Sequence, residues 1–95
     1  MRTEPKTVDV ICQHSRDGTV IPMRVRIKDE DGEYQAYTIK TFKNLSHQGS
    51  REMPDGIYVN NATLIFECSI STLGRERRIR LYCDDVESGW KMTAV

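Results

Sequence analysis

Residues 8–27 read VDVICQHSRDGTVIPMRVRI, two runs of alternating apolar and polar residues separated by Asp17-Gly18. Alternation at period two is typical of a β-strand with one buried face. Asp-Gly suits a two-residue type I′ loop, because glycine tolerates positive φ and aspartate adopts it at small cost. A loop closed there predicts three inward-facing apolar pairs: Val8 with Ile27, Val10 with Val25, and Cys12 with Met23. The outward-facing pairs are Asp9 with Arg26 and Ile11 with Arg24. A slip of one residue would bury the arginines, so this register is well determined.

Two further glycine turns predict hairpins with the same division between inside and outside. Glu30-Asp31-Gly32 suits a three-residue loop, a type I turn followed by a glycine bulge. Gly74-Arg75 suits a type II′ loop, because glycine takes its first position. The inner pairs expected in the second hairpin are Val25 with Tyr37 and Met23 with Ile39. Those expected in the third are Ile70 with Ile79, Cys68 with Leu81, and Phe66 with Cys83.

The whole chain contains seven segments of strand character, at 7–14, 19–28, 33–42, 57–59, 62–72, 75–84 and 90–94. No window carries a sustained helical period, so we expect no substantial helix. The pattern predicts an all-β fold, a small six- to seven-stranded antiparallel barrel of SH3-like or OB-like architecture. A two-sheet sandwich is the alternative. Residues 1–95 are expected to form a single domain around one core, with residues 1–6 frayed.

Two residues interrupt the strand pattern, and one connection is long. Pro22 cannot donate a ladder hydrogen bond and falls opposite Gln13 on the outer face, so we expect the third strand to diverge near it. Phe42 falls outward by strict alternation, which predicts a bulge or a strand end at 40–42.

Residues 43–56 form the long connection and end in the turn sequence Met53-Pro54-Asp55-Gly56. Connections of this length in a small domain are often functional.

The composition excludes several classes of protein. Lys+Arg and Asp+Glu both number 14, so the net charge is zero and any basic surface must be local. No apolar run is long enough to span a membrane, and residues 1–6 lack the apolar segment of a signal peptide. Three cysteines without a CxxC pair argue against a disulfide framework. We therefore expect a cytoplasmic protein that does not associate with membranes.

Cysteine and histidine give no pattern of a metal or catalytic site. The predicted registers place Cys12, Cys68 and Cys83 in the core, where free cysteine is commonly found. Cys12 and His14 are the one closely spaced pair, which falls short of a zinc site. His47 lies in the 43–56 connection, and no nucleophile, base and orienting group come together. We expect no metal, no cofactor and no enzymatic activity.

Basic and aromatic side chains share the predicted outer face. Arg24, Arg26 and Lys28 form one row beside Tyr34, and a second row on another strand ends in a tyrosine. Proteins bind single-stranded nucleic acid through such combinations of phosphate contacts and base stacking, and OB-like barrels do so on a sheet face. The candidate nucleic-acid-binding residues are Arg24, Arg26, Lys28, Tyr34, Arg78, Arg80 and Tyr82. A joint site requires both rows to lie on one side of the barrel.

Two alternatives compete with nucleic-acid binding. A half-buried sheet needs a polar outer face in any case, and Asp9 opposite Arg26 neutralises part of the charge. The second alternative is a protein-interaction accessory subunit that binds a protein partner or a second copy of itself. It would use a sheet edge, at 57–59 or at 62–72, or the 43–56 loop.

Overall fold

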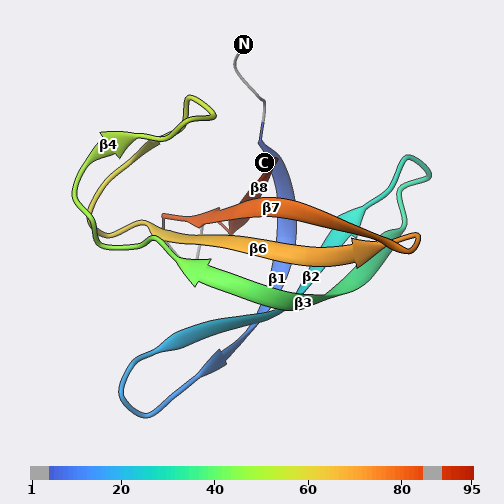
Figure 1. The fold of residues 1–95 in the computed structure, drawn as a ribbon, viewed down its shortest axis with the longest axis horizontal. Coiled ribbons are helices and arrows are strands. Elements are labelled where there is room, and N and C mark those ends of the chain that lie inside the picture. Colours follow the sequence, from blue (N-terminus) through green and yellow to red (C-terminus); the bar gives the residue numbers. More distant parts are fainter. Residues whose placement is uncertain (1–4, 85–88) are drawn as a thin grey trace.

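The computed structural model describes residues 5–84 and 89–95, and within these ranges every regular element is a β-strand. The strands are β1 (Lys6–His14), β2 (Val20–Lys28), β3 (Tyr34–Asn44), β4 (Arg51–Glu52), β5 (Tyr58–Val59), β6 (Leu64–Thr72), β7 (Arg75–Cys83) and β8 (Trp90–Ala94). Six of them close an antiparallel barrel in the order β1-β2-β3-β6-β7-β8, and β4 and β5 form a separate two-stranded sheet (Figure 1). The predicted all-β antiparallel barrel is confirmed. The described residues contain no helix that could cross a membrane.

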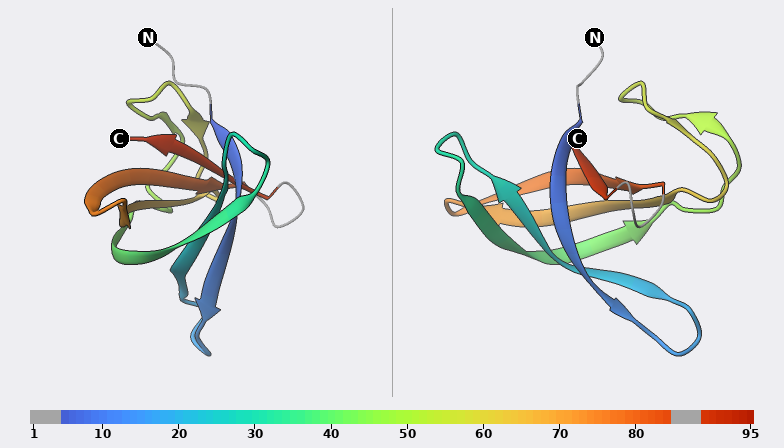
Figure 2. Two further views of the ribbon diagram at one scale, coloured as in Figure 1. Left: turned by 90° about the vertical axis from the view of Figure 1, so that its right-hand side faces the viewer. Right: turned by 180° about the vertical axis from the view of Figure 1, so that it is seen from behind.

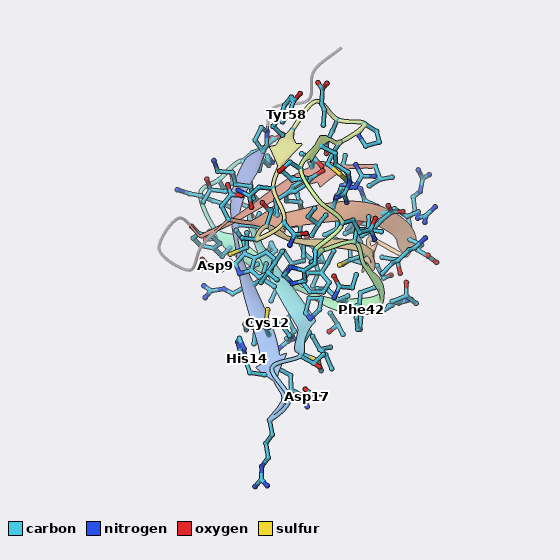
Figure 3. All side chains as sticks on the ribbon, turned by 90° about the vertical axis from the view of Figure 1, so that its left-hand side faces the viewer. Asp9, Cys12, His14, Asp17, Phe42 and Tyr58 are labelled. Carbon is cyan, nitrogen blue, oxygen red and sulfur yellow. The ribbon has the colours of Figure 1, made fainter. Side chains whose placement is uncertain are left out.

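Two hairpins extend beyond the barrel. The strand β8 pairs with β1 at Lys6 to Val8, and β3 pairs with β2 from Arg24 onward, so residues 11–23 project as a two-stranded arm. Residues 45–60 form a second projection, the lobe, which carries β4 and β5. Figures 1 and 2 show the arm and the lobe leaving the barrel in different directions. Figure 3 shows Cys12, His14 and Asp17 in succession along the arm and Tyr58 on the lobe.

The strands β6 and β7 are buried on both faces where the lobe covers them, whereas residues 75–78 of β7 are exposed. Their inward side chains, among them Phe66 and Leu81, join Val8 and Val25 in the barrel core. Their outward side chains Ile65 and Tyr82 pack under the lobe against Met53 and Val59. The lobe thus provides a second core, and the 43–56 segment is not one irregular loop, since β3 runs to Asn44 and β4 begins at Arg51.

The first hairpin differs from its predicted geometry near the turn. The loop holds three residues rather than two, closed by Ser15 N donating to Thr19 O at 2.9 Å. A bulge at Met23 compensates: Ile11 faces Arg24 as predicted, but Cys12 faces Pro22. Met23 is consequently 43% exposed and Pro22 is buried, so the predicted inward pair of Cys12 and Met23 is wrong, as is Pro22 opposite Gln13.

The second hairpin and the bulge in β3 follow the sequence pattern. Gly32 has φ +85°, its N–H bonds to Asp29 O at 3.1 Å, and Val25 faces Tyr37 as predicted. The other predicted inner pair, Met23 with Ile39, is wrong, because the pairing of β2 with β3 starts at Arg24 opposite Thr38 and Met23 is exposed. The register of β3 against β6 shifts between Ile39 and Thr41, which confirms the expected bulge. As a result the Phe42 ring turns toward the core and meets Phe66 edge-on at 6.0 Å.

The third hairpin is shifted by two residues from its predicted register. Its loop is Leu73-Gly74, with φ of +49° and +77°, so both loop residues are left-handed as in a type I′ turn. The inner pairs become Ile70 with Arg77, Cys68 with Ile79, and Phe66 with Leu81. The predicted type II′ turn is therefore wrong. A shift of two preserves the inward and outward faces, because side chains alternate at period two.

The expectations for the cysteines and the N-terminus are met in part. Cys68 and Cys83 are buried as predicted, but Cys12 is only half-buried, because it lies where β1 leaves the barrel. Burial raises the pKa of the Cys68 thiol to about 12, so this thiol stays neutral at pH 7. The sequence predicts that residues 1–6 fray. Residues 1–4 lie outside the described residues, but Lys6 is already the first residue of β1, where it pairs with Met92 of β8.

We expect Leu73→Asn to stabilise the protein. Leu73 is fully exposed and holds a left-handed conformation, which costs a branched side chain about 1 kcal/mol, whereas asparagine adopts it readily before glycine. A gain of about 1 kcal/mol should raise the unfolding midpoint by roughly 4–8 °C, measured by circular dichroism on heating. Leu73→Ala removes the exposed side chain but keeps the backbone penalty, so it serves as the control. Equal midpoints for the two variants would contradict this account of the turn.

Candidate functional site

The row of Arg24, Arg26 and Lys28 lies on the outer face of β2, as predicted. The three side chains occupy alternate positions, so successive ones are about 7 Å apart along the strand. Tyr34 stands opposite Lys28 on β3 and is 48% exposed. The Arg26 guanidinium carbon lies 5.1 Å from the centre of the Tyr34 ring, a cation–π contact that holds the two side chains together. We call these four residues the β2–β3 face.

Most of the charge on the β2–β3 face is not neutralised. Asp9 approaches Arg26 at 3.8 Å, but both side chains are about half exposed, so this pair is weak. Neither Arg24 nor Lys28 forms an ion pair with any residue that the structure describes. The acidic side chains nearest in sequence lie in the β2–β3 turn, where Asp29 accepts hydrogen bonds from Asp31 N and Glu33 N.

Exposed apolar side chains flank Arg24. Ile11 stands directly opposite it on β1, and Met23 precedes it at the bulge and is exposed. Both side chains are among the large exposed hydrophobic groups of the protein. Cations next to open apolar surface suit a ligand with a charged backbone and flat hydrophobic rings.

The predicted row on β7 is not a free surface. Arg80 and Tyr82 are only 7% and 4% exposed, because the lobe covers them, so the expectation that they stand outside is wrong. Arg78 is exposed, but its guanidinium bonds to Glu67 at 2.9 Å. The sequence pattern could not reveal that the lobe covers Arg80 and Tyr82. Alternation shows which residues point away from the barrel core, but not whether they meet solvent or a second core.

Arg80 and Tyr82 belong instead to a buried polar network around Asp55. The Oδ2 atom of Asp55 accepts hydrogen bonds from Tyr82 Oη and Thr93 Oγ1, both at 2.7 Å, and from Arg80 at 3.3 Å. Glu67 accepts a further bond from Arg80 at 3.3 Å. Charged groups are rarely buried unless they are paired in this way. The network ties the lobe to β7 and β8.

The network also determines the protonation of its members. Burial opposes ionisation of Asp55, but the hydrogen bonds from Tyr82 and Thr93 and the nearby charge of Arg80 outweigh it, so the pKa of Asp55 lies below its usual value. Burial, together with the Asp55 carboxylate, raises the pKa of Tyr82. Tyr82 is therefore a neutral donor at pH 7.

The closed barrel places the two predicted rows on opposite sides. In the ring β1-β2-β3-β6-β7-β8, β2 and β7 are three positions apart in either direction. Of the seven candidate residues, the structure brings together the four of the β2–β3 face. Arg78 lies across the barrel from them, and the remaining two are buried beneath the lobe.

The sequence reading missed Asp55, Thr93, Ile11 and Met23 as notable residues. The sequence Met53-Pro54-Asp55-Gly56 predicts the turn that contains Asp55. The burial of Asp55, however, depends on the packing of the lobe against the barrel. Met23 is turned outward by a bulge that a loop one residue longer makes necessary. Asp17 is itself a signal for the β1–β2 turn, because aspartate side chains often accept a hydrogen bond from the backbone two residues later. Here the Asp17 carboxylate accepts from Thr19 N at 3.0 Å.

The residues that the structure describes contain no group of three or more His, Cys, Asp or Glu that could hold a metal ion. No protein-family model, curated protein or solved structure matches this chain. The residues of the site are therefore the sole guide to function.

We expect Asp55→Asn to destabilise the protein in a pH-dependent way. Because the pKa of Asp55 is lower in the folded protein than in the unfolded chain, its ionised form favours folding above about pH 4, and this contribution is lost as the pH falls through the folded pKa. The variant should lose about 2 kcal/mol of unfolding free energy at pH 7, since buried donors lose a charged acceptor. Urea titrations at neutral and acidic pH would measure the difference, which should shrink toward about pH 3.

The matched control is Asp9→Asn, which removes a carboxylate whose partner is half exposed. Its effect should stay within about 0.5 kcal/mol. If Asp55→Asn were as stable as the unmodified protein at pH 7, the network would not hold the lobe in place.

Proposed function

We propose that the protein is a non-catalytic binding module that binds single-stranded nucleic acid on its β2–β3 face. The observation that carries the proposal is a row of three exposed cations, two of them without an ion-pair partner among the described residues, beside exposed aromatic and apolar side chains. Phosphate contacts supply most of the affinity of such surfaces, and ring contacts with the bases supply the rest.

Each member of the face has a distinct role in this proposal. Arg24 and Lys28 contact phosphates at the two ends of the row. Tyr34 stacks on a base, and Arg26 holds its ring from one side, at 5.1 Å from the centre. Ile11 and Met23 provide apolar surface for a further base beside Arg24.

The acidic β2–β3 turn limits the path that a bound nucleic acid can take over the surface. Asp29, Glu30, Asp31 and Glu33 lie just beyond Lys28 and would repel phosphates there. The nucleic acid is therefore expected to pass from Lys28 toward Arg24 and the arm, rather than over the turn.

Binding of a labelled single-stranded oligonucleotide, measured by fluorescence anisotropy, tests the proposal. The two phosphate contacts of Arg24 and Lys28 predict a slope of about −1.4 for the logarithm of affinity against the logarithm of salt concentration. The double variant Arg24→Gln/Lys28→Gln removes both contacts, so its slope should flatten to about zero. Absence of binding even at about 50 mM salt would end the proposal.

The matched control is Arg75→Gln/Arg78→Gln, which removes two charges from β7 on the opposite side of the barrel. Its affinity and salt slope should equal those of the unmodified protein. Equal losses in the two double variants would point to the overall charge rather than to the β2–β3 face.

A protein-interaction role is the second candidate. The strand β6 pairs with both β3 and β7, so the expectation of a free edge at 62–72 is wrong. The edge at 57–59 has more support, because β5 pairs only with β4 among the described strands and its Tyr58 is 76% exposed. Tyrosine is enriched in the cores of protein interfaces.

Light scattering after size exclusion tests the homodimer form of this second candidate. A dimer that becomes a monomer in Tyr58→Ser would support association through the lobe. A monomer at every concentration would exclude the homodimer, and a dimer that Tyr58→Ser does not weaken would exclude the lobe as its interface.

A further inference from the structure

A cavity of about 390 Å³ opens at one end of the barrel, within the range of small-molecule sites. Its lining includes Thr72 and Leu73 at the β6–β7 turn, which is at the right in Figure 1 and faces the viewer in the left-hand view of Figure 2. Side chains from all six barrel strands line the cavity. The apolar part of the wall comes from Ile27, Ile70, Ile79 and Met92.

Two cations occupy inward-facing positions of this wall. Lys6 is two residues before the buried Val8, so both lie on the same face of β1, and it pairs with Met92. Arg77 is two residues before the buried Ile79 and pairs with Ile70 across the ladder. Alternation therefore directs both side chains toward the mouth of the barrel rather than to its outer face.

The wall of the cavity itself includes no aspartate or glutamate, and its other polar side chains are Tyr37 and Thr72, since the Thr93 hydroxyl bonds to Asp55. Lys6 also lines a second pocket together with Asp29 and Glu30. Neither Lys6 nor Arg77 forms an ion pair within the described part of the chain. An apolar chamber with two unpaired cations at its rim is complementary to an anion that has an apolar body.

We propose that the mouth of the barrel binds a small organic carboxylate with an aliphatic or aromatic body. The apolar body enters between Ile27, Ile70 and Ile79. The carboxylate stays at the rim, where Arg77 can donate two parallel hydrogen bonds and Lys6 adds a second charge. This site uses the inner face of the strands, whereas the β2–β3 face is on the outside, so neither proposal depends on the other.

Three probes of equal chain length test the chemistry: octanoate, octan-1-ol and octylamine. Calorimetry should show octanoate binding at least about tenfold more tightly than the alcohol, and the amine not at all, because a charge-assisted hydrogen bond adds about that factor. Methyl NMR spectra should locate the ligand through shifts at Ile27, Ile70 and Ile79. Equal affinity for octanoate and octan-1-ol, or no shifts at these methyl groups, would overturn the proposal.

Substitutions separate the contribution of charge from that of the chamber. Arg77→Gln should weaken octanoate binding roughly tenfold and leave octan-1-ol unchanged. Thr72→Phe places a ring in the mouth and should abolish binding of both. Arg78→Gln is the matched control, because it removes a cation on the outer face of the same strand, outside the cavity wall, and it should bind like the unmodified protein. If Arg78→Gln weakened octanoate as much as Arg77→Gln, the charge effect would be general and the proposed site would be wrong.

Discussion

Closure of the barrel by β8 is the constraint on which the rest of the structure depends. This five-residue strand pairs with β1 through Lys6, Thr7 and Val8, and with β7 from Ile79 to Tyr82. A sheet that closes on itself gives every strand an inner and an outer face and removes the free edges of an open sheet. The inner residues of all six strands then meet at one mouth, while β2 and β7 face away from each other.

Closure also explains why the basic surface is smaller than the sequence suggests. Two arginine rows on two strands look like one surface when the sheet is imagined flat. In the ring they oppose each other, and the lobe covers Arg80 and Tyr82 with its own core. Two groups of cations carry the proposals, the outward row of the β2–β3 face and the inward pair of Lys6 and Arg77. Among the described residues only Arg26 of these five forms an ion pair, a weak one with Asp9, which is why each group suggests an anionic ligand.

Alternation of apolar and polar residues predicts most of the fold, because the side-chain period of a strand is two and glycine turns limit the register. The second hairpin and the bulge before Phe42 follow from local rules. Three features do not. Leu73 adopts a left-handed conformation that its own preference opposes, in a two-residue loop directly after the pair of Thr72 with Arg75. Met23 bulges outward to absorb a longer loop. The burial of Asp55 and Arg80 requires contact between the lobe and the barrel, which no local pattern encodes.

The pairing of β8 with both of its neighbours can be measured directly by nuclear Overhauser effects between backbone protons. Closure predicts cross-strand signals between Thr7 and Lys91 on one side of β8, and between Leu81 and Met92 on the other, in the same sample. Signals on both sides would establish the ring that separates the inner face from the outer one. Signals to β7 without any to β1 would mean an open sheet. The opposition of β2 and β7 and the six-stranded mouth would then both be wrong.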